Sequence, residues 1–493
     1  MMKISKKFKI SLILLFLISV ISLFLFLKPP NKSLQPNVLL ITIDCLRFDH
    51  LSCYGYKRHT SPNIDNLAKE GAMFTQAIVQ SYWTLPSVSS IITSTYPPVH
   101  RVLDFGDSIN PKILTLSEIL KKEGYRTGVI CPDFFTTIGR LGRGFDLFDA
   151  NLENEDAARL TQKAMNWFKR NKHKPFFLWL HYFDAHTPYR AADPYNKMFL
   201  KDGFYDKKIE NLPVDPNVSI RAIPKRIIKD NITDGNYYIS QYDGAIRSVD
   251  AQIGVLLGAL KSLSMDSNTL IIITADHGEL LGESGIFFDH VGFFEEVLRV
   301  PLLMRFNNLI PKHKVIGCQV QAIDIVPTIL EILKVDKLSF MQGFSLLPVI
   351  LGRGNYCPPY TFFYAIESIC GIRTSEWKLI YVDWEKAGVF AKRMTGWGLL
   401  NEEAAHSLIE YFRSNLHKEK NKLPSAEYIL YDLKQNPSEP IKSINLEKER
   451  FIILKEKLEE FMRLGNQALS KAKVRINLDE ETKERLKSLG YVQ

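Results

Sequence analysis

The stretch N-V-L-L-I-T-I-D, residues 37–44, is a short apolar run that ends in a carboxylate. Such a run of aliphatic and β-branched residues is typical of a buried parallel strand, with Asp44 at its carboxyl end. Three further runs have the same character, namely R-T-G-V-I-C (126–131), P-F-F-L-W-L-H (175–181) and T-L-I-I-I-T-A-D (269–276). The repeated pattern predicts a buried sheet.

Segments with helical periodicity lie between these runs, at 114–123, 157–169 and 246–260. Strands that alternate with helices predict an α/β fold, with a mainly parallel sheet flanked by helices. Functional groups in such sheets gather beyond the carboxyl ends of the strands, where Asp44, His181 and Asp276 fall. We therefore expect three separate strands to supply one site.

Shorter strands follow from about residue 355, in T-F-F-Y-A-I and W-K-L-I-Y-V, and a charged helix follows them, which indicates a smaller carboxyl-terminal α+β subdomain. Residues 193–234 carry Pro213, Pro216 and Pro224 without periodicity, so we expect a surface excursion beside the substrate entrance. The predicted segments are a cytosolic tail and membrane anchor (1–35), a catalytic domain (36–352), the subdomain (353–445) and a helical tail (446–493).

The amino terminus predicts a membrane anchor. Four lysines precede an apolar run at 10–27, which ends at Lys28-Pro29-Pro30. About 18 helical residues span roughly 27 Å, close to the hydrocarbon thickness of a bilayer. The leading lysines favour a cytosolic tail, which places the remaining chain outside the cytoplasm as a single-pass membrane protein. A cleaved signal peptide is the alternative, but no small-x-small site follows the run, so we expect an uncleaved anchor.

The formal net charge is +9, with the basic residues spread thinly. No basic stripe interleaved with aromatic residues stands out, so we predict no nucleic-acid partner. Six cysteines have irregular spacing, which indicates neither a zinc ribbon nor a dense disulfide framework. A single bridge between Cys357 and Cys370 is compatible with an oxidising compartment.

Two segments carry candidate oxygen donors. Asp44 in I-D-C-L-R is a natural ligand for a divalent cation, and Arg47 is placed to hold an anion. Thr84 in W-T-L-P-S precedes Pro86 at an expected helix start, where backbone N–H groups face an anion and a cation would activate the hydroxyl. Each segment alone is more typical of a helix cap.

Two other segments carry histidines. In H-Y-F-D-A-H-T-P, His186 is the better candidate for a substrate contact, whereas His181 is expected to be a buried core histidine. In T-A-D-H-G-E, Asp276 and His277 are placed to bind one metal ion. With Asp44 and Thr84 they make four mixed oxygen and nitrogen ligands, suited to zinc, manganese, magnesium or calcium.

Together these segments resemble the sulfatase family of the alkaline phosphatase superfamily. The resemblance runs from residue 37 to the end, through N-V-L-L-I-T-I-D-C-L-R-F-D-H-L-S-C-Y-G, W-T-L-P-S-V-S-S-I-I-T-S-T-Y-P-P-V-H, H-Y-F-D-A-H-T-P-Y, D-H-G-E-L-L-G-E and L-Y-D-L-K-Q-N-P-S-E-P. Family members carry cysteine or serine in a C/S-x-P-S-R motif, which is converted to formylglycine. Thr84 stands there in this chain, and threonine cannot give formylglycine.

Three other positions depart from the pattern: Val88 replaces the motif arginine, Cys45 replaces the second aspartate of an Asp-Asp pair, and His277 replaces an asparagine. The Asp-His pair and the threonine resemble the superfamily's phosphodiesterases and its phosphoethanolamine and glycerophosphate transferases, which use threonine as nucleophile.

The resemblance implies a role for each candidate residue. Thr84 is the expected nucleophile and a metal-facing oxygen, and the expected metal ligands are Asp44, Asp276 and His277. His186 would act on the leaving group, His290 on a non-bridging oxygen and Arg47 on the anion.

The implied substrate is an anionic ester, namely a sulfated or phosphorylated glycan, lipid or small molecule. The implied reaction is metal-dependent hydrolysis of a sulfate or phosphate ester. Two alternatives stay open: a phosphoethanolamine or glycerophosphate-type transferase at the membrane, and a sulfatase-like binding protein that has lost catalysis.

Overall fold

The computed structural model describes residues 35–104, 106–131, 141–149, 156–189, 191–200, 209, 211–215, 219, 221–307, 309–354, 357–366, 369–386, 425–435 and 448–469. The apolar run predicted to anchor the chain and the end of the helical tail lie outside these ranges. Within them, no helix combines the length and the apolar character needed to cross a bilayer.

An eight-stranded sheet forms the centre of the molecule, in the order β12-β2-β11-β8-β1-β5-β3-β4. Its strands are β1 (Asn37–Ile43), β2 (Ala72–Ile78), β3 (Arg126–Ile130), β4 (Leu147–Asp149), β5 (Phe176–Tyr182), β8 (Thr269–Ala275), β11 (Arg299–Arg305) and β12 (Lys314–Gln321). Only β11 runs antiparallel to its neighbours among these eight strands. The prediction of a mainly parallel sheet is confirmed.

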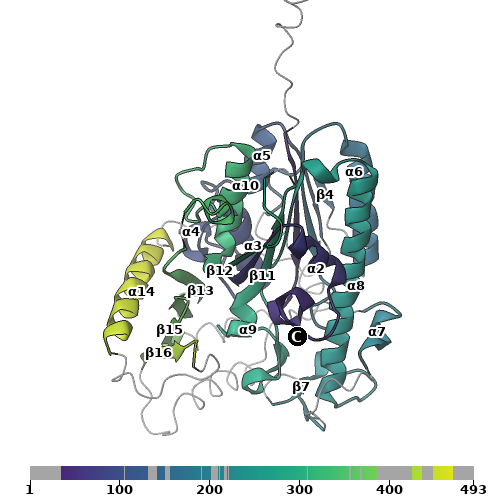
Figure 1. Ribbon diagram of the computed structural model, residues 1–493. Helices are drawn as coiled ribbons and strands as arrows, with labels where there is room; N and C mark the ends of the chain where they lie inside the picture. Colours follow the sequence, from purple (N-terminus) through teal and green to yellow (C-terminus); the bar gives the residue numbers. More distant parts are fainter. Residues whose placement is uncertain are drawn as a thin grey trace, which may run out of the picture.

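The three central strands β8, β1 and β5 bury every side chain, because helices cover both faces of the sheet. Figure 1 shows α6 and α8 along one face and α3 and α10 along the other. The helices are α2 (Pro62–Lys69), α3 (Thr84–Thr93), α4 (Pro97–His100), α5 (Leu116–Lys122), α6 (Ala157–Asn171), α7 (Tyr195–Met198), α8 (Gly235–Ser262), α9 (Glu295–Leu298), α10 (Ile325–Leu333), α11 (Leu347–Ile350) and α14 (Lys448–Leu469).

A second, antiparallel sheet has the order β13-β14-β15-β16. Its strands are β13 (Thr361–Ile366), β14 (Ile369–Arg373), β15 (Trp377–Asp383) and β16 (Ala426–Asp432), so the runs T-F-F-Y-A-I and W-K-L-I-Y-V correspond to β13 and β15. Leu454 and Leu458 of α14 are buried in one cluster with Ile372 and Leu379 of this sheet. The amphipathic helix α14 therefore covers one face of the smaller sheet (Figure 1).

A disulfide joins Cys318 of β12 to Cys357, with a Cα–Cα distance of 5.9 Å. The predicted pairing of Cys357 with Cys370 is wrong, because Cys370 lies in β14 and its thiol is buried in the core beneath α14. The bridge ties the last strand of the large sheet to the segment that leads into the small one.

Replacing Cys357 with serine should lower the free energy of unfolding by about 4 kcal/mol, since the bridge closes a loop between residues 39 apart. Denaturant unfolding of the oxidised proteins measures this loss, and wild type treated with a reductant should unfold like the variant. Equal stability of oxidised wild type and variant would contradict the pairing.

A buried ion cluster also joins the small sheet to α9, the helix that leads into β11 of the large sheet. Glu295 of α9 lies 2.8 Å from the Arg373 guanidinium and 3.3 Å from Lys378 Nζ, and the three side chains are 14%, 3% and 1% exposed. Burial opposes ionisation of Glu295, but the two cations outweigh burial and lower its pKa to about 2. The charged acid therefore stabilises the fold.

Glu295→Gln should lower the free energy of unfolding by about 3 kcal/mol or more, because two buried cations lose their counter-ion. The folded pKa lies below the unfolded value, so this stabilisation is present above about pH 4.5 and is lost as the pH falls towards 2. The stability difference between wild type and variant should shrink across that window. Glu385→Gln, at an exposed acid just after β15, should leave stability unchanged.

Candidate functional site

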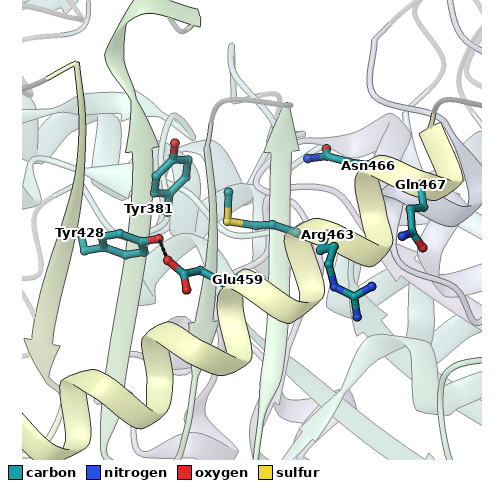
Figure 2. Close-up of a pocket in the computed structure, with 7 residues that line it drawn as sticks. Tyr381, Tyr428, Glu459, Arg463, Asn466 and Gln467 are labelled. Carbon is teal, nitrogen blue, oxygen red and sulfur yellow. Dashed lines mark hydrogen bonds between the residues drawn. The ribbon is translucent and has the colours of Figure 1, made fainter.

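A surface hollow lies between the small sheet and α14, lined by Tyr381, Tyr428, Glu459 and Arg463 among others (Figure 2). The Tyr428 hydroxyl donates a hydrogen bond of 2.8 Å to Glu459. None of the described residues that line this hollow is a histidine or a cysteine. The buried acids, histidines and cysteine that suit ester chemistry gather elsewhere, beyond the carboxyl ends of the central strands.

Asp44 follows β1 directly and is fully buried. Its carboxylate lies 3.5 Å from His181 Nε2 and 3.6 Å from His277 Nε2. Burial opposes ionisation, but the hydrogen bond from His181 and the nearby imidazoles outweigh it and hold the pKa of Asp44 well below its usual range. A charged carboxylate is thus available at the end of the central strand.

Thr84 is the first residue of α3 rather than its N-cap, and it is fully buried. Its hydroxyl oxygen lies 3.1 Å from His277 Nε2. Ser87, one turn along, donates a hydrogen bond of 2.5 Å to the carbonyl of Asp276 and so ties α3 to the end of β8. The start of α3 therefore presents a hydroxyl and a positive helix end to the strand edge.

Asp276 and His277 follow β8 and are both fully buried. His277 Nδ1 lies 3.0 Å from the Gly278 carbonyl, and since a carbonyl only accepts, Nδ1 is the donor. Nε2 then carries the lone pair and faces Asp276, 3.4 Å away. Gly278 is required, because a Cβ there would lie 1.9 Å from the Glu296 carbonyl oxygen.

These donors fit a divalent cation. Asp276 Oδ2 is buried and accepts no hydrogen bond within the described ranges, and burial followed by the charge of Asp44 raises the pKa of Asp276. A cation would relieve this repulsion and supply the missing partner. Asp44, Thr84, Asp276 and His277, the predicted ligands, all lie at this point. His181 joins them, since it offers a donor within 4.8 Å of both aspartates.

His186 and His290 lie beside these donors, with ring centroids 5.5 Å apart. Burial lowers the pKa of His186 to about 4, so its imidazole is neutral at pH 7. Burial also disfavours charge on His290, but the Glu279 carboxylate, 3.8 Å from Nδ1, outweighs burial and raises the pKa of His290. His290 is therefore the better proton donor of the two.

The Arg47 guanidinium is engaged by two acids. It lies 2.7 Å from Asp49 and 2.7 Å from Glu283, and the Arg47 side chain is 4% exposed. Its backbone N–H donates to the Tyr242 hydroxyl, which donates in turn to the Cys45 carbonyl. These contacts brace the turn after β1.

Three residues in this cluster were not assigned to chemistry from the sequence: His181, Cys45 and Glu279. His181 and Cys45 carry a signal, since they lie at the carboxyl ends of β5 and β1. No feature of the sequence indicates Glu279. Its Oε2 lies 3.8 Å from His290 Nδ1 only because of the turn that follows β8.

The excursion between β5 and α8 reaches this cluster. Ser219 accepts a backbone hydrogen bond from Phe287 and its hydroxyl donates to Asp289, 2.8 Å away in each case. Both partners belong to β10 (Phe287–Asp289), which immediately precedes His290. Part of the predicted surface excursion thus lies beside a site histidine.

Comparisons with known proteins show which family the chain resembles. The sulfatase family model matches residues 36–335, and a model of the N-sulphoglucosamine sulphohydrolase carboxyl-terminal region matches 282–421. The N-acetylglucosamine-6-O-sulfatase of Bacteroides thetaiotaomicron is 24% identical over 444 residues, which cover 71% of this chain and 79% of that protein.

Two solved structures share the fold. One, in complex with its substrate D-glucosamine-2-N,6-O-disulfate, has a TM-score of 0.69 at 20% identity and covers 88% of this chain and 98% of its own. The other, a phosphonate monoester hydrolase of Agrobacterium radiobacter, has a TM-score of 0.67 at 18% identity and covers 90% and 100%. Because the family model spans more than half of its length, the chain belongs to the sulfatase family of the alkaline phosphatase superfamily.

Proposed function

We propose that this chain is a metal-dependent hydrolase of phosphate or sulfate esters in which Thr84 forms a covalent ester intermediate. The observation that carries the proposal is the Thr84 hydroxyl, buried at the start of α3 and 3.1 Å from His277 Nε2. Threonine cannot become formylglycine, so the side chain itself is the available nucleophile. The cation held by Asp44, Thr84, Asp276 and His277 would lower the pKa of the hydroxyl and neutralise charge on the transferred group.

The proposed reaction proceeds through two successive displacements at the phosphorus or sulfur atom. Thr84 Oγ1 forms a bond to phosphorus or sulfur as the bond to the leaving oxygen breaks, and the hydroxyl proton passes to solvent. His290, whose pKa is raised by Glu279, gives a proton to the leaving oxygen. Water then attacks the same atom, Thr84 oxygen leaves and regains a proton, and the free acid departs.

The substrate class proposed is an anionic ester on a glycan, a lipid or a small molecule. Support for a glycan comes from the N-acetylglucosamine-6-O-sulfatase relative, and support for phosphorus comes from the phosphonate monoester hydrolase with the same fold. The side chain at position 84 favours phosphate at least as strongly as sulfate.

We also propose that the enzyme works outside the cytoplasm, held by the apolar run at 10–27. The Cys318–Cys357 disulfide supports this location, because such bonds persist in oxidising compartments.

Initial rates on aryl phosphate diester, aryl phosphate monoester and aryl sulfate test the reaction class. The full chain, purified with its metal, should turn over at least one phosphate ester as fast as the sulfate. Turnover of the sulfate alone would contradict the phosphorus chemistry, and no turnover of any of the three would contradict the hydrolase.

A further inference from the structure

A second set of soft donors adjoins the Asp44 carboxylate. Cys45 Sγ and one nitrogen each from His186 and His290 all lie within 4.8 Å of one another. Cys45 Sγ is 3.9 Å from His290 Nδ1, and Cys45 and His186 are at most 2% exposed. The proposed function uses His290 as a proton donor and gives neither His186 nor the Cys45 thiol a step in the reaction.

The hydrogen bond made by His186 leaves the lone pair on Nε2, the nitrogen available to bind a metal with Cys45 and His290. His186 Nδ1 lies 2.6 Å from the Thr187 carbonyl and must donate to it, so Nε2 is the nitrogen with the lone pair. A ring nitrogen fixed in this way by a backbone carbonyl is the usual arrangement of a metal-binding histidine. His277 has the same arrangement at the first set of ligands.

A buried carboxylate completes the second set. Glu279 is fully buried, and its Oε2 accepts no hydrogen bond within the described part of the chain. That oxygen lies 3.8 Å from His290 Nδ1, while Oε1 accepts from the Tyr189 hydroxyl. A buried acid oxygen without a hydrogen bond, beside a thiol and two imidazoles, indicates a missing cation.

The backbone holds the thiol in this position. Cys45 has φ 56°, in the left-handed region that few residues other than glycine adopt. The Tyr242 hydroxyl donates to the Cys45 carbonyl at 2.7 Å and accepts from the Arg47 N–H at 2.9 Å, which locks the turn. Strained conformations of this kind are concentrated at functional sites.

We propose that Cys45, His186, His290 and Glu279 hold a second divalent cation, and that this cation is zinc. Thiolate and imidazole are soft and borderline ligands that favour zinc over magnesium or calcium. Cys45 gives up its proton to solvent as its sulfur binds the ion. The inference rests on the proposed function for the first ion. With the second ion bound, His186 and His290 would be its ligands, and this ion rather than a proton on His290 would stabilise the leaving oxygen.

Cobalt substitution and metal analysis test the second site without relying on turnover. The full chain, stripped of metal and reloaded with Co²⁺, should hold two ions and show a thiolate-to-cobalt charge-transfer band in the near ultraviolet. Cys45→Ser should abolish the band and reduce the stoichiometry from two ions to one. Cys370→Ser is the matched control, since Cys370 is also buried and free but lies beneath α14, and it should keep both ions and the band.

Two more variants separate this inference from the proposed function. Asp276→Asn should lose the first ion and keep the band, whereas His290→Asn should lose the second ion and the band with it. If Asp276→Asn keeps both ions while Cys45→Ser loses one, the second site stands and the first ligand set is wrong.

A wild type with a single ion, or with a band that survives Cys45→Ser, would overturn the second site. Circular dichroism checks that each variant folds. If Cys45→Ser does not fold, the wild-type stoichiometry and band together with His290→Asn decide the question.

Discussion

Replacing Thr84 with alanine should lower kcat/KM by at least about 10⁴-fold on the phosphate ester that the wild type turns over best, as expected for loss of a covalent nucleophile. The hydroxyl oxygen lies 3.1 Å from His277 Nε2, and the described ranges place no other hydroxyl at that distance from it. Alanine therefore removes the attacking atom and one oxygen donor of the first cation. Thr84→Ser keeps both and should stay within about tenfold of wild type.

Thr93→Ala is the matched control for this substitution. Thr93 lies on the same helix, is equally buried, and its hydroxyl donates to the Ser89 carbonyl rather than to the site. It should cost about 1 kcal/mol of stability and little activity. Rapid acid quench of wild type with substrate, followed by mass spectrometry, should find the phosphoryl group on the peptide that contains Thr84. Turnover of a sulfate ester that survives Thr84→Ala would overturn the threonine mechanism.

Much of the fold follows from local patterns. The run at residues 37–44 becomes β1 because its apolar side chains are buried on both faces, and the run at 269–276 becomes its parallel neighbour β8. Parallel strands bring their carboxyl ends to one edge, so Asp44 and Asp276 meet for a reason that the sequence already contains.

The rest depends on long-range packing. The disulfide partner of Cys357 is set by where β12 lies relative to β13, and spacing along the chain does not record this. The approach of Glu279 to His290 requires the turn after β8, and the engagement of Arg47 by Glu283 joins residues 236 apart. The sequence placed His181 at the same edge as Asp44, but it could not separate a site role from the burial that is commoner for such a histidine, and the contact of its ring with Asp44 appears only in the structure.

Asp276→Asn should abolish binding of the first cation and lower kcat/KM by about 10³-fold or more, because one of its charged oxygen ligands becomes neutral. Metal analysis of purified protein should find one ion fewer than in wild type. Asp324→Asn is a suitable control, since Asp324 is equally buried but accepts from the backbone N–H groups of Gln321 and Phe344. That variant should retain wild-type metal content.

The effect of Asp276→Asn on stability should reverse when the metal is removed. Without a cation, Asp44 and Asp276 present carboxylate oxygens within 4.8 Å of each other, and the charge of Asp44 opposes ionisation of Asp276. Asparagine removes that repulsion, so in a chelator Asp276→Asn should melt at or above the temperature of wild type. With a saturating cation, wild type should gain about 3 kcal/mol at a free concentration 100 times Kd, whereas the variant lacks this contribution. Melting curves recorded with and without chelator should therefore cross, and a variant less stable than wild type under both conditions would mean that Asp276 serves the fold rather than a metal ion.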